Sequence, residues 1–144
     1  MVSSSTVAFG CHSPATVEVW DWKEGKQLRI LTGFSGSYVF GTARLPDARL
    51  VAVGSDGYIR IGTVDNWSAA TVINNGAYLM GVVAAQDGSF VTADSRGETR
   101  LWRNGVCEAT LKGSHAGASY GNPVSIVGCR LVTIGAGRSL LLVE

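Results

Sequence analysis

The segment "FVTADSRGETRLW", residues 90–102, determines how the rest of the chain is interpreted. Two short runs rich in β-branched and aromatic residues, 90–94 and 99–102, flank the tripeptide Ser95-Arg96-Gly97. Such runs favour β-strands, and Ser and Gly between them favour a tight turn. The segment is therefore predicted to be a β-hairpin.

The second half of this hairpin recurs about every forty residues. "VEVW", "IRIG", "TRLW" and "LLLV" begin at residues 17, 59, 99 and 140, which are 42, 40 and 41 residues apart. Another strand is expected before each of them, at 7–10, 50–54, 90–94 and 131–135. Each such pair is expected to form a hairpin.

Two further strands complete the repeating unit. One follows three of the four hairpins and ends at a glycine, at 27–33, 69–76 and 107–113. The other precedes the next hairpin, at 37–45, 77–85 and 119–127. No window shows apolar residues at i, i+3, i+4 and i+7 over three turns, so the chain is predicted to be all-β.

Four antiparallel strands per forty residues are typical of one blade of a β-propeller. The predicted strands supply about three and a half blades in a single domain over residues 1–144, with blades at approximately 6–33, 37–76, 77–113 and 114–144. Larger rings are usual, so the chain is expected to be a partial propeller, either a fragment of a longer protein or a self-associating half. A closed four-bladed ring is the alternative.

The repeat resembles the WD-repeat family, in which a Trp-Asp pair closes the third strand of a blade and a Gly-His pair lies between blades. Trp20-Asp21 is a complete pair, and Trp102 is a second tryptophan at this position. The segment "LKGSHAG", 111–117, is similar to the Gly-His turn with one inserted serine, which places His115 there.

In that family a Trp, a Ser, a His and an Asp hold a blade together. The resemblance implies that Asp56 and Asp94 lie near the position of this Asp and that Ser55 lies close to the Ser. Gly62 and Val143 stand where a Trp belongs, and no repeat contains all four residues. The structural repeat signature is therefore expected at Trp20, Asp21, Trp102, Asp56 and Asp94, with weaker closure than in a complete repeat.

Three tyrosines begin equivalent strands, because Tyr38, Tyr78 and Tyr120 are 40 and 42 residues apart. In the WD family these strand starts line the top face, where partners bind, and tyrosine is favoured at protein interfaces. The resemblance implies a top-face binding surface with the candidates Tyr38, Tyr78, Tyr120, Phe34 and His115. The alternative is that the tyrosine rings pack between blades.

The charge balance argues against a nucleic-acid partner, since twelve Lys and Arg and eleven Asp and Glu are spread along the chain with a net charge of +1. No signal peptide and no apolar run of membrane-spanning length are seen, so the expected location is cytoplasmic, with the nucleus as the alternative and no membrane partner. Cys11, Cys107 and Cys129 lack zinc-site spacing and are expected to pack as small apolar residues.

Motifs that would carry catalysis are incomplete. Residues 117–121 match the G-x-S-x-G pattern of a nucleophile elbow around Ser119, but no helix is expected after them, and only Glu144 follows as an acid. Cys11 and His12 are adjacent, which places them on opposite faces of a strand. No catalytic residue, metal or cofactor is therefore predicted.

The function that the resemblance implies is a non-enzymatic scaffold or adaptor that binds a protein or peptide. A hydrolytic enzyme with a site in the channel and a structural subunit that completes another propeller are the alternatives. The segment 101–115 is also similar to WD repeats of phospholipase A2-activating proteins, which implies a role in ubiquitin binding.

Overall fold

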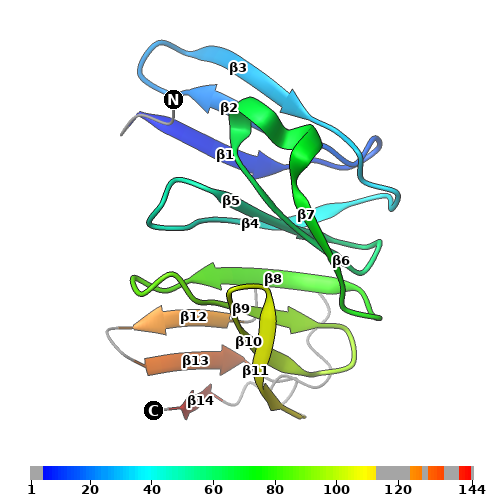
Figure 1. The fold of residues 1–144 in the computed structure, drawn as a ribbon, viewed down its shortest axis with the longest axis vertical. Coiled ribbons are helices and arrows are strands. Elements are labelled where there is room, and N and C mark those ends of the chain that lie inside the picture. Colours follow the sequence, from blue (N-terminus) through cyan, green and yellow to red (C-terminus); the bar gives the residue numbers. More distant parts are fainter. Residues whose placement is uncertain (1–4, 113–123, 128–129, 135–139, 144) are drawn as a thin grey trace.

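The computed structural model describes residues 5–112, 124–127, 130–134 and 140–143, and these residues form an all-β structure. The strands belong to four antiparallel sheets, in each of which the strand order follows the chain order. Sheets 1 to 4 succeed one another from β1–β3 at the top of Figure 1 to β12–β14 at the bottom. The predicted all-β class and the predicted hairpins are confirmed.

The strands of the four sheets have the following bounds. Sheet 1 consists of β1 (Thr6–Gly10), β2 (Val17–Asp21) and β3 (Lys26–Leu31). Sheet 2 consists of β4 (Val39–Arg44), β5 (Leu50–Gly54), β6 (Tyr58–Gly62) and β7 (Thr71–Asn74). Sheet 3 consists of β8 (Leu79–Ala84), β9 (Phe90–Asp94), β10 (Thr99–Arg103) and β11 (Val106–Leu111). Sheet 4 consists of β12 (Val124–Val127), β13 (Arg130–Ile134) and β14 (Leu140–Val143).

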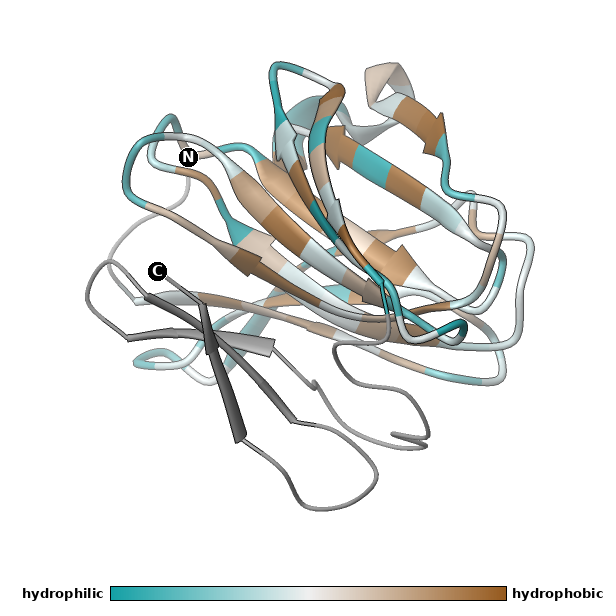
Figure 2. Ribbon diagram, turned by 90° about the horizontal axis from the view of Figure 1, so that it is seen from below, coloured by the Kyte–Doolittle hydropathy of each residue, from teal (hydrophilic) through white to brown (hydrophobic). Residues whose placement is uncertain are grey.

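The turns form where turn-compatible residues stand. Gly57 and Gly97 close the β5–β6 and β9–β10 turns with φ of 79° and 85°, a left-handed conformation that suits glycine. The amide of each glycine donates to the carbonyl of the residue three before it, Gly54 and Asp94. In the coloured part of Figure 2, hydrophobic residues lie mainly along the strands and many hydrophilic ones lie at the turns.

Two apolar layers hold the first three sheets together. One lies between sheets 1 and 2 and includes Val17, Val19 and Ala52. The other lies between sheets 2 and 3 and includes Val53, Ile59 and Phe90, among others. Each layer forms because alternate residues of a strand point to opposite faces, so an interior sheet presents apolar residues to both neighbours.

The edge of sheet 1 is joined to sheet 2 by polar contacts. The hydroxyl of Thr42 on β4 donates to the carbonyl of Ala8 on β1 at 3.0 Å. Beyond β1, the amide of Val39 donates to the carbonyl of Cys11 at 3.1 Å. In sheet 2, β4 pairs with β5 and so covers that edge of the hairpin. Sheet 1 has no described strand in the place of β4, and the contacts from Thr42 and Val39 cover part of the free edge of β1 instead.

One short helix was not predicted from the sequence. The strand expected over 69–76 is present as β7, which begins at Thr71 and ends at Asn74, and a 3₁₀ helix that was not predicted, η1 (Val64–Ala69), precedes it. Trp67 of η1 is buried, and its indole N–H donates to the carbonyl of Thr32 at 3.2 Å. The burial of this ring against sheet 1 accounts for the helical turn between β6 and β7.

Within the described part of the chain, no helix has the length and apolar character that crossing a bilayer requires.

Candidate binding surface

Tyr38 and Tyr78 hold the same place in sheets 2 and 3, each one residue before its first strand. The amide of Ser55 donates to the carbonyl of Tyr38 at 2.9 Å, and the amide of Ser95 donates to the carbonyl of Tyr78 at 2.8 Å. The side chains are nevertheless exposed, by 43% for Tyr38 and 61% for Tyr78. The backbone of each tyrosine is thus held in place while its ring faces solvent.

The β5–β6 turn holds the loop that leads to Tyr38. The hydroxyl oxygen of Ser55 accepts hydrogen bonds from the amides of Ser37 at 2.9 Å and Tyr38 at 3.0 Å. The neighbouring Asp56 accepts one from the amide of Ser35 at 3.1 Å. A Cβ atom at Gly36 would collide with the turn, so only glycine allows the loop to pass this close.

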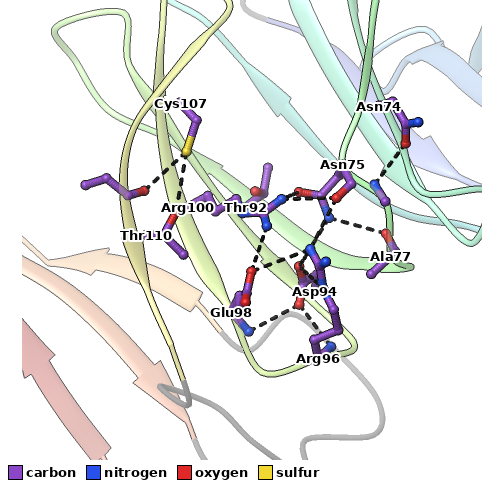
Figure 3. Close-up of polar contacts among 12 residues, drawn as sticks. Asn74, Asn75, Ala77, Thr92, Asp94, Arg96, Glu98, Arg100, Cys107 and Thr110 are labelled. Atoms are coloured by element: carbon purple, nitrogen blue, oxygen red, sulfur yellow. Dashed lines mark hydrogen bonds and ion pairs between the residues drawn. The ribbon is translucent and has the colours of Figure 1, made fainter.

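A second polar network occupies the equivalent place in sheet 3, and Figure 3 shows its side chains. Asp94, at the end of β9, accepts hydrogen bonds from the amide group of Asn75 at 3.2 Å and from Arg96 at 2.9 Å. Asn75 also accepts one from Arg100 at 2.6 Å, and Arg100 reaches Glu98 at 2.7 Å. The network ties the β9–β10 hairpin to the loop that leaves sheet 2.

Asn75 and Ser35 are equivalent, because each stands three residues before the tyrosine that follows it. Both are bound by a carboxylate of the next hairpin, Asp94 for Asn75 and Asp56 for Ser35. The two carboxylates hold different register positions, since Asp94 ends β9 while Asp56 lies within the β5–β6 turn. The equivalent loops before Tyr38 and Tyr78 are therefore each held by a carboxylate, but the two carboxylates come from different positions of the hairpin.

Burial raises the pKa of Asp94, but hydrogen bonds from Arg96, Asn75 and backbone amides outweigh it and hold the pKa below the usual aspartate value. The pKa of Asp56 is also lowered, because the amide of Tyr58 and the guanidinium of Arg60 outweigh burial. Nη1 of Arg60 lies 2.7 Å from the Asp56 carboxylate as an ion pair, although the contact lacks the direction of a hydrogen bond. Both carboxylates are therefore charged at neutral pH.

Aromatic rings extend the surface around Tyr38. Its ring stacks on Phe40 with centroids 5.4 Å apart and an interplanar angle of 13°, and it lies 5.5 Å from the ring of His12. Phe40 is exposed, and it points the same way as Tyr38, two residues along the strand. His12, Tyr38 and Phe40 thus form a continuous row of rings, which we call the aromatic row.

The other sequence-predicted candidates lie apart from this row. Phe34 is half-buried, packs at 6.2 Å from Trp67, and has the guanidinium of Arg60 4.8 Å from its ring centroid. Tyr120 and His115 lie outside the described residues, as do Ser119 and Cys129. The structure therefore brings Tyr38 together with His12 and Phe40, and it places Phe34 in a packing contact.

The predicted signature residues have structural contacts. The indole N–H of Trp102 donates to the hydroxyl of Thr92 at 2.9 Å, and that of Trp20 donates to Glu18 at 2.8 Å. Asp21 accepts hydrogen bonds from the amides of Lys23 and Glu24, so it shapes the turn between β2 and β3.

Sequence reasoning missed Thr92, Asn75 and Trp67. Asn75 could have been found by aligning the repeats, because it lies three residues before Tyr78 as Ser35 lies three residues before Tyr38. Thr92 could not, because Phe9 and Ala52 hold its register position in sheets 1 and 2. Trp67 gave no such signal, since it lies outside every repeated segment. The expectation that Cys107 packs as a small apolar residue is wrong, because this thiol is exposed on β11, an outer strand.

Among the residues that the structure describes, no three His, Cys, Asp or Glu side chains gather as metal ligands. A scan against protein-family models and a search of curated proteins found no match to this chain.

Proposed function

We propose that this chain is a propeller-like repeat protein of the WD-repeat type, and that it acts as a non-enzymatic interaction module. Four successive antiparallel sheets with a common hairpin register support the blade assignment. The binding surface is the end of the sheets that carries Tyr38, Tyr78 and the aromatic row, and its ligand is a protein segment or peptide with an apolar anchor.

The observation that carries this proposal is the contrast between backbone and side chain at the two tyrosines. Their carbonyls are fixed by Ser55 and Ser95, yet 43% of Tyr38 and 61% of Tyr78 stay exposed, even though the Tyr38 ring also contacts His12 of the β1–β2 connection. A tyrosine held in this way loses little conformational freedom when it binds, and it offers a large rigid contact area with a polar tip. Such residues frequently dominate the energy of protein interfaces.

The polar networks below the surface serve this function by preorganising it. Ser55 and Asp56 fix the loop before Tyr38, while Asp94 and Asn75 fix the loop before Tyr78. A ligand then meets two loops that are already in their bound conformation. Preorganisation of this kind increases affinity because less ordering is left for the binding step.

The test is selection of a displayed random-peptide library on the wild-type protein, followed by titration of the selected peptides. We expect the double variant Tyr38→Ala/Tyr78→Ala to bind at least about tenfold more weakly, because truncating an interface tyrosine typically removes more than 1 kcal/mol. Its melting temperature should stay close to that of the wild type, since exposed substitutions change stability little.

The matched control is Val72→Ala/Val106→Ala, which truncates two exposed apolar side chains on the outer strands β7 and β11. This control should bind the selected peptides as the wild type does. Equal binding by the tyrosine variant, or a large fall in its melting temperature, would show that the two rings support the fold and would refute the proposal.

A further inference from the structure

Sheet 1 has one face that no described sheet covers. The hairpin register pairs Val7 with Trp20 and Phe9 with Glu18, so these four side chains share the face of sheet 1 that points away from sheet 2. We call this the outer face of sheet 1. Its centre is apolar, and Glu18 is engaged by the indole N–H of Trp20 at 2.8 Å.

The same register positions are buried in the next two sheets. Leu50 and Phe90 correspond to Val7, because each lies opposite the residue at the Trp position, Gly62 or Trp102. Ala52 and Thr92 correspond to Phe9 in the same way. All four are at most 6% exposed, whereas Val7 is 40% and Phe9 is 45% exposed.

The preceding sheet is what buries these positions. Leu50 and Ala52 pack in one apolar cluster with Val17 and Val19 of sheet 1. Phe90 packs in another with Val51 and Val53 of sheet 2. Each sheet thus covers one face of the sheet that follows it. The outer face of sheet 1 could be covered in the same way by one more sheet, whose covering residues would stand at the register positions that Val51, Val53, Ile59 and Ile61 hold in sheet 2.

Sheet 4 has these register positions. In sheet 2 the covering pairs are Val51 with Ile61 and Val53 with Ile59. The β13–β14 hairpin pairs Val132 with Leu142 and Ile134 with Leu140, with the same spacing around its turn. Aliphatic residues thus occupy all four positions in sheet 4, as they do in sheet 2, and no sheet follows it among the described residues.

We propose that the outer face of sheet 1 docks onto sheet 4 of a second copy of this chain. The contact repeats between molecules the packing that already joins sheets 1 to 2 and 2 to 3 within one molecule. It is heterologous, because the two surfaces differ, and two such contacts close a pair of chains into one ring. Each chain carries both surfaces, so a pair needs no other component.

The test begins with sedimentation of the wild-type protein over a wide range of concentrations. We expect reversible association to twice the 15.1 kDa mass of one chain. Phe9→Lys should weaken this association by about a hundredfold, because the contact would have to remove a charged ammonium group, and the Glu18 carboxylate opposite it, from water. Val72→Lys is the matched control, since Val72 is 53% exposed on the outer strand β7, and it should associate as the wild type does.

A mixing experiment distinguishes a head-to-tail contact from a symmetric one. Leu142→Lys should also weaken association, and a mixture of the Phe9→Lys and Leu142→Lys proteins should recover a pair, because each supplies the surface that the other has kept. If Phe9→Lys weakened association and Leu142→Lys did not, the contact would be a symmetric one between two outer faces, and the proposal would be overturned.

Hydrogen–deuterium exchange on the wild type provides a readout that does not depend on how the variants fold. At high concentration β1, β2, β13 and β14 should become protected relative to low concentration, while β7 should not change. A wild-type protein that stays monomeric, or protection confined to other strands, would overturn the proposal and leave the outer face to a sheet from a different polypeptide.

Discussion

The indole N–H of Trp102 donates a 2.9 Å hydrogen bond to the hydroxyl of Thr92, which joins strands β10 and β9 across the buried face of sheet 3. The same indole stacks on Phe90 with ring centroids 6.3 Å apart. Trp102 therefore fills apolar volume against sheet 2 and also satisfies a buried hydroxyl. A tryptophan at this position does more for the fold than its hydrophobic area alone would indicate.

Replacing Trp102 by Phe should destabilise the protein by about 1–3 kcal/mol, because Thr92 is left buried without its donor. Thr92→Val should also destabilise it, since the indole N–H then lacks an acceptor. The double variant should lose less than the sum of the two single losses. Urea unfolding of the four proteins measures this coupling, and strict additivity would show that the hydrogen bond contributes nothing to stability.

Gly62 occupies the position in sheet 2 that Trp102 occupies in sheet 3. The ring of Trp67 fills part of the space that a tryptophan at position 62 would take. A Cβ atom at Gly62 would lie 2.8 Å from the Cβ of Ala70 and 3.4 Å from Cε3 of Trp67. The Trp67 ring thus lies against the space where a side chain would begin. Trp67→Ala should cost about 3–5 kcal/mol, as a large buried side chain is lost.

Thermal unfolding followed by circular dichroism checks this prediction. The control is Trp22→Ala, which removes an exposed tryptophan and should change stability by less than about 0.5 kcal/mol. Gly62→Trp should destabilise the protein as well, although it introduces the residue that two of the other repeats carry at this position, Trp20 and Trp102. If Gly62→Trp stabilised the protein, η1 would have to move aside, and Trp67 would not be the substitute for the tryptophan that is missing at position 62.

The carboxylate of Asp94 should make stability depend on pH. Its pKa in the folded protein lies below the usual aspartate value of 3.8, because hydrogen bonds outweigh the effect of burial. Its contribution to stability is therefore fully present above that value and is lost as the pH falls through the folded pKa. We expect a steep loss of stability below about pH 4.

Asp94→Asn should be less stable than the wild type at pH 7 by about 2–3 kcal/mol, since charge-assisted hydrogen bonds from Arg96 and Asn75 are lost or weakened. The difference should shrink as the pH is lowered. Chemical denaturation at a series of pH values measures both effects, and a difference that stays constant down to pH 2 would contradict the assigned role of the charge.

Ser55→Ala should loosen the loop before Tyr38. The Ser55 hydroxyl accepts the amides of Ser37 and Tyr38, whereas the hydroxyl of Ser95, at the same place in the β9–β10 turn, makes no hydrogen bond to a described residue. We expect a loss of about 1 kcal/mol for Ser55→Ala and almost none for Ser95→Ala. Amide hydrogen exchange over 35–38 should rise only in the first variant, and equal behaviour of the two would refute this assignment.

The hairpins could be predicted from sequence because their determinants are local. Residues 90–94, 95–97 and 99–102 contain strand formers, a turn with glycine, and strand formers again, and such a pattern pairs with itself over a short span of chain. The recurrence of this unit then gave the division into sheets. Asp94 and Trp102 were predicted as structural residues because the resemblance of the repeated unit to the WD repeat implies that role for them.

Contacts between distant segments could not be predicted in this way. Trp67 is recognised as the occupant of the space at Gly62 only when η1 is seen folded against β6, and Phe40 joins Tyr38 only because the strand exposes both. Phe34 was grouped with the tyrosines as a top-face candidate, yet its ring contacts Arg60 and Trp67.

The amino-acid sequence by itself determined that this protein is a series of antiparallel hairpins with a fixed period, because alternation and turn chemistry act between residues that are close along the chain. Tertiary structure alone decided which equivalent side chains are buried. Val7 and Leu50 are both aliphatic and hold the same register position, but only Leu50 has a sheet packed in front of it. Burial depends on what lies across the sheet, and that neighbour comes from a different part of the chain.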